Sequence, residues 1–400
     1  MKILEEGEFR LDKTIYFDNA ATTQISSEVL NKMMPYLTEE YFNPSSLYSR
    51  AQKVKNAIEE ARKNVAEALG ADPNEIYFTS GATESNNWAI HSIVEQNKKN
   101  GKQCHIITSK IEHPSVLNVF KKLERDGLEV SYLNVDAEGR VSPEELEKTI
   151  KSNTVLVSVM YANNEVGTLQ PISELGEICR KHNVVFHTDA VQAIGNVKID
   201  VLHQNIDMLS LSGHKFHAPK GVGALYVRKG LKVENLLFGG GQERGKRAGT
   251  ENVASIVGLG CAIAEATKDI EVKNRHLKEL REMLLSGIKK IPKVKYNGSL
   301  EHGLTGTLNF SFEGIEGEGI LLLLNSYGIC CSSGSACTSG SLDPSHVLLA
   351  MGLDHGLAQS SVRISLSKYN TSEEVEKFLE VINPIVERLR KMSPVWNEKI

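Results

Sequence analysis

Short apolar segments that alternate with helix-length segments constrain this fold more than any other feature of the chain. Residues 155–160, 184–188 and 208–212 are rich in aliphatic and β-branched residues and are typical of buried strands. Helix-length segments separate most of them, for example residues 143–151 and 171–182. This alternation predicts an α/β fold, in which helices cover both faces of a mainly parallel sheet. The other predicted strands of this part are residues 75–80, 105–108, 130–135 and 223–227.

The pattern changes after about residue 252, where strands become fewer and helices longer. A helical stretch over residues 262–288 precedes a strand at 307–312 and a helix at 317–324. A strand at 362–366 and a final helix from Thr371 follow. Because 400 residues exceed what one hydrophobic core usually serves, we expect two domains. The prediction is a large domain over residues 15–260 and a smaller α+β domain made of residues 1–14 and 261–400.

Composition excludes several classes of function. Lys and Arg total 46 against 50 Asp and Glu, and a net charge of −4 argues against broad binding to nucleic acid or an anionic membrane. The longest purely aliphatic run, residues 320–324, is too short to cross a bilayer. Residues 1–13 have no apolar core of a secretory signal. Six cysteines are too sparse for a disulfide scaffold, so a cytoplasmic protein with reduced thiols is expected.

Two glycine-containing segments are candidates for holding a phosphate. Residues 80–84 (SGATE) follow a predicted strand and open a helix, where backbone N–H groups and the helix N-terminus favour an anion. The alternative is a plain strand-to-helix turn capped by Thr83. Residues 239–250 are glycine-rich, basic and hydroxyl-bearing, which suits phosphate contact but equally suits a flexible surface loop.

Two strand ends carry residues that suit a pyridine-type aldehyde cofactor. Asp189 ends one strand, where it can hold a protonated pyridine nitrogen or serve as a helix N-cap. Lys215 ends the next, where it can form a Schiff base or be a surface lysine, with Lys220 as a rival. Gln192 could donate to a ring oxygen, and Ser212 and His214 could reach a phosphate. The phosphate turn, the Asp at a strand end and the His-Lys pair on the next strand follow one another in this order along the chain. Together with the glycine-rich segment 239–250, this order favours a single cofactor site over a chance combination of four features.

Motifs spread over most of the chain resemble the cysteine desulfurases of NifS/IscS type. The resemblance extends from about Ile15 to the last helix. Its most specific part is the segment around Cys337. The motifs are residues 16–23 (YFDNAATT), 43–46 (NPSS), 112–113 (EH), 163–167 (NNEVG), 212–215 (SGHK) and 332–339 (SSGSACTS).

The resemblance implies a fold of the aspartate-aminotransferase class, pyridoxal 5′-phosphate as cofactor, no metal, and a homodimer. Lys215 would bind the cofactor covalently and remove the Cα proton of L-cysteine. His113 would stack on the ring and transfer protons. Cys337 would attack the substrate sulfur and become a persulfide, with release of L-alanine. The cofactor would also contact Ala82, Thr83, Asn164, Asp189, Gln192, Ser212, His214 and the partner subunit's Thr250, and the substrate carboxylate would contact Asn164 and Arg363.

The surroundings of Cys337 agree with a catalytic rather than an inert thiol. Residues 332–341 are almost entirely Ser, Gly, Ala and Thr, a composition that predicts a mobile loop. Sulfur would then pass to an iron–sulfur scaffold protein or another acceptor, such as a tRNA-thiolation enzyme. Cys330 and Cys331 depart from the family pattern. They are interpreted as buried small hydrophobes, as accessory thiols, or less well as part of a metal site with Cys337.

Rival functions remain open on the same residues. A selenocysteine lyase or cysteine-sulfinate desulfinase would depend less on the loop thiol, and an aminotransferase would need a keto-acid acceptor. A non-catalytic sulfur-scaffold protein would not need both Lys215 and Cys337, and both are present.

Overall fold

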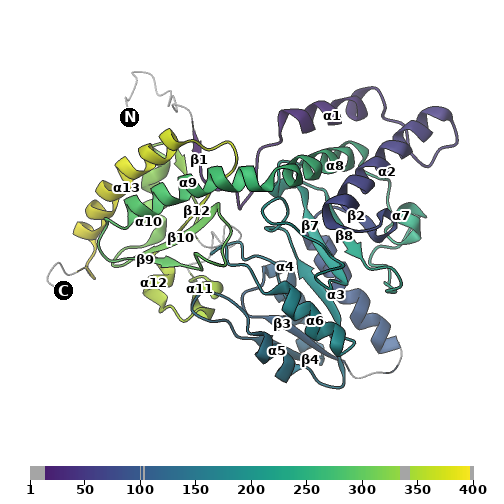
Figure 1. Cartoon of the computed structure of the whole chain (residues 1–400), viewed down its shortest axis with the longest axis horizontal. Helices are drawn as coiled ribbons and strands as arrows, with labels where there is room; N and C mark the ends of the chain where they lie inside the picture. Colours follow the sequence, from purple (N-terminus) through teal and green to yellow (C-terminus); the bar gives the residue numbers. More distant parts are fainter. Residues whose placement is uncertain (1–13, 100, 102–103, 334–342, 397–400) are drawn as a thin grey trace.

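The computed structural model describes residues 14–99, 101, 104–333 and 343–396 of the chain (Figure 1). Its centre is a seven-stranded sheet in the order β2-β8-β7-β6-β5-β3-β4, in which only β8 runs antiparallel to its neighbours. The mainly parallel α/β sheet predicted from the sequence is therefore confirmed. The strands are β2 (Ile76–Thr79), β3 (His105–Ser109), β4 (Glu129–Leu133), β5 (Thr154–Ser158), β6 (Val185–Asp189), β7 (Met208–Ser212) and β8 (Gly223–Val227).

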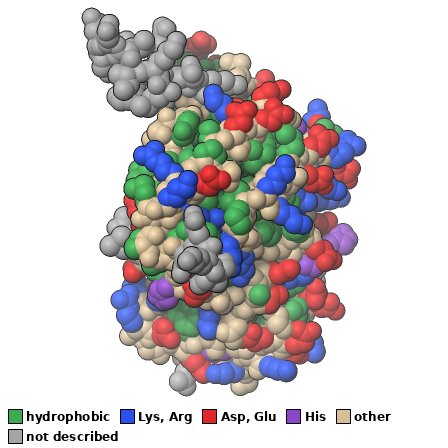
Figure 2. Space-filling model, turned by 90° about the vertical axis from the view of Figure 1, so that its left-hand side faces the viewer, with side chains coloured by type: hydrophobic (Ala, Val, Ile, Leu, Met, Phe, Trp, Pro, Cys, Tyr) green, Lys and Arg blue, Asp and Glu red, His purple; other side chains and the backbone are tan. Residues whose placement is uncertain are grey.

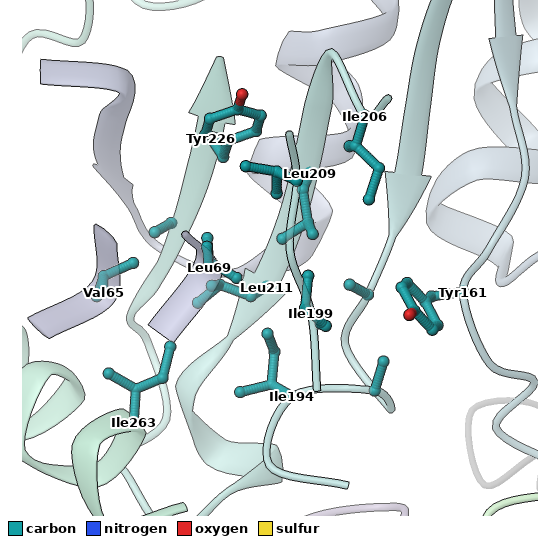
Figure 3. Packing of buried hydrophobic residues seen from close by; sticks show 14 of the residues in the cluster. Val65, Leu69, Tyr161, Ile194, Ile199, Ile206, Leu209, Leu211, Tyr226 and Ile263 are labelled. Carbon is teal, nitrogen blue, oxygen red and sulfur yellow. The ribbon is translucent and has the colours of Figure 1, made fainter. Parts of the chain in front are cut away.

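Helices cover both faces of this sheet because its strands are apolar on both sides. Met208 packs with one set of helices and Leu209 with the other, as the alternation of side chains along a strand requires. One face packs against α3 (Ala82–Lys99) and α4 (Pro114–Arg125). The other packs against α2 (Ser49–Leu69), α6 (Ile172–Lys181) and α8 (Val253–Lys268), and Figure 3 shows part of this core.

Local sequence signals explain where several of these helices end. Gly70 follows α2 in the left-handed region, with φ of 68°, as a residue without Cβ does most easily. The stretch predicted as one helix over residues 262–288 is interrupted at Asp269, between α8 and α9 (Ile270–Ile288). The final helix, α13 (Ser372–Met392), begins after Thr371 with a capping box to Glu374.

A second core forms around an antiparallel sheet in the order β12-β10-β9. Its strands are β9 (Val294–Asn297), β10 (Thr307–Phe312) and β12 (Ser361–Ser365), and they pack against α9, α10 (Gly317–Ser326) and α13. Ile15 and Phe17 also pack here, because β1 (Ile15–Tyr16) pairs with β11 (Ile329–Cys330). The remaining elements are α1 (Ser27–Thr38), α5 (Pro143–Thr149), α7 (Gln242–Gly245), α11 (His346–Ala350), α12 (His355–Gln359) and the 3₁₀ turns η1 (Pro73–Glu75) and η2 (Gly213–Lys215).

The surface agrees with the nearly balanced charge of the chain. On the face shown in Figure 2, Lys and Arg side chains are interspersed with Asp and Glu. Among the described helices, none combines the length and apolar character that crossing a bilayer requires.

Close packing of α2 on α8 depends on Gly260. A Cβ at this position would lie 2.5 Å from the Cα and 2.6 Å from the Cβ of Ala61. We predict that Gly260→Ala lowers the melting temperature by roughly 2–6 °C, because two helix backbones must separate. In Gly319→Ala on α10, where the new Cβ would meet Leu389 at 3.5 Å, thermal scans should show no loss. Equal melting temperatures for Gly260→Ala and wild type would contradict this packing argument.

Candidate active site

A cavity of about 460 Å³ opens where β5, β6 and β7 end. Parallel strands place their carboxyl ends at one edge of the sheet, and ligands of open α/β sheets bind beyond that edge. Predicted residues that line the cavity are Ala82, Thr83, His113, Asn164, Asp189, Gln192, Ser212, His214, Lys215 and Arg363. Thr250 is exposed and does not line it, and Cys337 lies outside the described residues.

The turn before α3 is built around a close backbone approach. Gly81 has φ of 149°, and a Cβ on Gly223 would lie 2.7 Å from its Cα, so both positions need glycine. Glu84 fixes the turn, because its Oε2 accepts two hydrogen bonds from Ser80. The backbone N–H of Ser80 donates at 2.8 Å and the Ser80 hydroxyl donates at 2.6 Å. Arg247 donates to both oxygens of Glu84, at 2.8 and 3.0 Å. The turn therefore presents the N-terminus of α3 to the cavity and is joined to the glycine-rich segment 239–250.

Asp189, at the end of β6, is only 5% exposed and its carboxylate is fixed by two donors. Asn86 Nδ2 donates to Oδ2 at 2.7 Å, and the N–H of Val191 donates to Oδ1 at 3.1 Å. Asn86 also donates to Ser115 Oγ at 2.9 Å. The carboxylate therefore has one orientation, set from α3 and α4 as well as from its own strand.

Lys215 lies at the end of η2, directly after β7. Its Nζ donates to the carbonyl oxygens of Ala20 and Ala21, at 2.7 and 2.8 Å. Gln192 Nε2 donates to the same Ala20 oxygen at 3.0 Å. The rival Lys220 also lines the cavity, but its side chain is exposed. The residue pair Ala20–Ala21 therefore orients Lys215 and Gln192 together.

His113 and His214, which both line the cavity, are kept neutral by burial. Burial, with the positive charges of Lys215 and Lys220, lowers the pKa of His214 to about 4. Burial also lowers the pKa of His113, although the charge of Asp189 opposes this. His113 caps α4, where its Nδ1 accepts the N–H of Ser115 at 3.1 Å. A neutral His113 therefore carries its proton on Nε2.

Arg363, on β12, is 1% exposed and reaches the cavity from the second core. Its Nη1 donates to the carbonyl of Asn164 at 2.9 Å, and its Nη2 donates to Asp18 Oδ1 at 2.6 Å. Its backbone pairs with Ser332, the last strand-like contact before segment 334–342. A buried guanidinium with these contacts suits a carboxylate ligand.

Buried carboxyl groups complete the wall behind Arg363 and His113. Burial raises the pKa of Glu112 to about 8, against the hydrogen bonds that its Oε1 accepts from Ser109 Oγ and from the N–H of Met160. Burial likewise raises the pKa of Glu165, which accepts a hydrogen bond from Ser345 Oγ. Neither carboxyl was predicted as a site residue.

Comparisons with known proteins agree with this architecture. Residues 15–378 match the family described as Aminotransferase class-V. The chain is 56% identical over 384 residues to the cysteine desulfurase IscS of Methanosarcina thermophila, covering 96% of this chain and 95% of the relative. A solved NifS-like protein is 43% identical with a TM-score of 0.89, covering 94% of this chain and all of the other. A solved structure of SspA in complex with cysteine is 40% identical, with a TM-score of 0.79 and coverage of 90% and 100%.

The chain belongs to the class-V aminotransferases, as its sheet and the site at the strand ends indicate. Within that class it is a member of the NifS/IscS-type cysteine desulfurases. The resemblance stated from the sequence is thereby confirmed.

Sequence reasoning missed the residues that position the site rather than form it. Asp18 and Ala20 lie in the motif at residues 16–23, and Glu165 lies in the motif at 163–167. These motifs indicated the family but gave no role for the three residues. Asn86 carried no signal, because a polar residue inside a helix gives no hint of the strand end that it faces.

The raised pKa of Glu112 predicts a dependence of stability on pH. Between about pH 4.5 and 8 the folded protein keeps a proton that the unfolded chain loses, so this carboxyl destabilises the fold increasingly as pH rises. Glu112→Gln cannot ionise. Its melting temperature relative to wild type should therefore rise by about 2 °C or more from pH 5 to pH 8.5. Glu67→Gln, on the exposed face of α2, should show a constant difference, and a constant difference for Glu112→Gln would contradict the burial argument.

Proposed function

We propose that this chain removes sulfur from L-cysteine with pyridoxal 5′-phosphate, releases L-alanine and leaves a persulfide on Cys337. The observation that carries the proposal is the cavity itself. It combines an anion-binding turn, a fixed carboxylate, an oriented lysine and a buried arginine. Membership of the cysteine desulfurases supports the reaction, and the structure of SspA in complex with cysteine supports the substrate.

The residues present fit the cofactor. A volume of about 460 Å³ is in the range of cofactor sites. Gly223 lets β8 lie directly against the turn at Gly81, because a Cβ there would be 2.7 Å from the Gly81 Cα. A carboxylate, an amine and a neutral histidine stand around the remaining space, as a pyridine ring with an aldehyde and a phosphate requires.

Each end of the cofactor would be held by a different part of the cavity. The phosphate would contact Ala82 and Thr83 at the start of α3, together with Ser212 and His214. Asp189 would hold the pyridine nitrogen protonated, Gln192 would donate to the ring oxygen, and His113 would stack on the ring. When bound, the cofactor supplies an electron sink for negative charge at the substrate Cα.

Lys215 would move the first proton. Its Nζ would bind the cofactor aldehyde and, once displaced by the substrate amine, remove the Cα proton. In the structure, the carbonyls of Ala20 and Ala21 fix the position of Nζ. His113, neutral and carrying its proton on Nε2, would return a proton to the substrate carbon.

The substrate carboxylate would bind between Arg363 and Asn164. Arg363 donates to the backbone of Asn164, so one contact orients both residues. Burial of the guanidinium strengthens its hydrogen bonds to a carboxylate by keeping water away.

Cys337 would attack the substrate sulfur as a thiolate. The described residues on either side of its segment are tied to the cavity wall: Ser332 pairs with the backbone of Arg363, and Ser345 donates to Glu165. Ser332 and Ser345, the described residues that flank this segment, therefore both lie at the substrate end of the cavity. The persulfide sulfur would pass to an iron–sulfur scaffold protein or another sulfur acceptor.

A homodimer would complete the cofactor site through the partner subunit's Thr250. Exposure of Thr250 at the surface supports this placement. Large apolar side chains are also exposed on α1 and in the segment that follows it, as a protein–protein interface requires. They are Leu30, Met34, Leu37, Tyr41, Leu47 and Tyr48.

The role of Cys337 is tested by products rather than by structure. Purified protein is incubated with L-cysteine and a thiol reductant, and alanine and sulfide are quantified beside a Cys337→Ser variant. We expect equal amounts of both products from the wild type and a loss of more than about 100-fold in the variant, which should retain the cofactor absorption. Full activity of Cys337→Ser would contradict the proposal and favour a selenocysteine-lyase-like or desulfinase reaction.

The role of Arg363 predicts an effect on substrate binding. Arg363→Lys keeps the charge but loses the planar fork that binds a carboxylate with two parallel hydrogen bonds. The KM for L-cysteine should rise about 10-fold or more, with cofactor absorption unchanged. The exposed Arg125→Lys on α4 serves as the matched control. An unchanged KM in Arg363→Lys would exclude this arginine from the carboxylate site.

A further inference from the structure

A third histidine, His346, lines the same cavity and has no part in the reaction described so far. It is the first residue of α11 and lines the cavity together with His113, Glu165 and Arg363. Its position is fixed by two contacts. Ser345, the N-cap of α11, binds the N–H of Leu348 and the carboxyl of Glu165. His346 itself contacts the backbone carbonyl of Glu112 through Nε2, at 3.0 Å.

The contact with Glu112 decides which nitrogen of His346 carries the proton. A carbonyl oxygen can only accept, so Nε2 must donate. The neutral imidazole therefore has its lone pair on Nδ1, and no group in the described part of the chain donates to that atom. Since His346 lines the cavity, its neutral ring would have Nδ1 as the acceptor for a bound ligand.

His113 and His346 are the same tautomer, with the proton on Nε2, but the protein contacts a different ring nitrogen in each. His113 accepts the N–H of Ser115 at Nδ1 and so carries its proton on Nε2, which makes it a donor. His346 carries its proton on Nε2, held by the protein, and has Nδ1 as an acceptor. One ring can give a proton to the substrate and the other can take one, which is the pairing that acid–base catalysis needs.

Geometry places the acceptor at the substrate end of the cavity. His346 interacts electrostatically with His113 and with Glu165, and Glu165 in turn interacts with Arg363. The turn at residues 80–83 follows β2, at one edge of the sheet, whereas His113 follows β3, near the other edge. The thiol of L-cysteine is two bonds from Cα, so a substrate whose carboxylate binds Arg363 would hold its thiol within reach of this cluster. The charged and titratable side chains that line the cavity around His346 are His113, Glu165 and Arg363, and Glu112 contacts it through the backbone carbonyl.

We infer that His346 is a further catalytic residue of the desulfurase reaction, whose Nδ1 takes the proton from the thiol of bound L-cysteine; this inference rests on the proposed function. The proton moves from sulfur to Nδ1 while the attacking thiolate forms the new S–S bond. The S–Cβ bond breaks with its electron pair on Cβ, which then takes a proton and becomes the methyl group of alanine. The new S–S bond uses a lone pair of the attacking thiolate, Cβ keeps the electron pair of the broken S–Cβ bond, and the proton of the thiol stays on Nδ1.

A pair of substrates separates this role from a structural one. β-Chloro-L-alanine loses chloride after removal of its Cα proton and has no thiol, so it needs Lys215 and the cofactor but not an acceptor for a thiol proton. In His346→Gln we expect kcat/KM for L-cysteine to fall about 100-fold, with the rate on β-chloro-L-alanine within about twofold of wild type. His355→Gln, at an exposed position of α12, is the matched control and should leave both rates unchanged.

The outcomes are distinct. Equal losses on both substrates, or no loss on either, would overturn the role of His346 while leaving the desulfurase reaction intact. A wild type without activity on L-cysteine would overturn the proposed function, and this role with it. Added imidazole should restore L-cysteine turnover to His346→Ala, and failure to restore it in a variant that still processes β-chloro-L-alanine would count against the role.

Discussion

The segment from Ile15 to Thr23 is the constraint on which the site depends. Its first residues, Ile15 and Phe17, are buried in the core of the antiparallel sheet, and its last carbonyls, at Ala20 and Ala21, accept hydrogen bonds from Lys215 of the parallel sheet. Between them Asp18 pairs with Arg363 at 2.6 Å. One short stretch of chain therefore sets the distance between the amine proposed for the chemistry and the guanidinium proposed for the substrate.

Burial and a few specific hydrogen bonds, rather than many ion pairs, determine which side chains at the cavity are charged. His113 and His214 are neutral because burial disfavours their charged forms, and Glu112 keeps its proton for the same reason. Asp189 and Arg363 are fixed by specific donors and acceptors instead. A substrate that is itself charged thus meets groups whose protonation states are already set.

Much of the fold could be predicted from the sequence because most strands of the large sheet are rich in apolar residues and several helices have recognisable ends. Strands β7, β8 and β10 begin and end at the predicted residues. Lys215 and Asp189 were found for a similar reason, since both follow such strands and parallel strand ends converge. The domain boundaries, and the roles of individual site residues, stay predictions.

The contacts that sequence could not give are those between distant segments. Asn86 on Asp189 and Asp18 on Arg363 join residues 103 and 345 positions apart, and neither pair shows any local pattern. His346 was missed because a single histidine at the start of a short helix has no distinctive spacing. Cys337 is the reverse case, since its motif is specific while its position lies outside the described residues.

The most direct test of the central claim is to locate the transferred sulfur on the protein. The cofactor-loaded enzyme is treated with L-cysteine without reductant, alkylated, digested and analysed by mass spectrometry. The account predicts one added sulfur atom on the peptide that contains Cys337, removable by reductant, and none on the peptides of the other cysteines. Added sulfur on Cys330 or Cys331 alone, or alanine release without sulfur on any peptide, would contradict it.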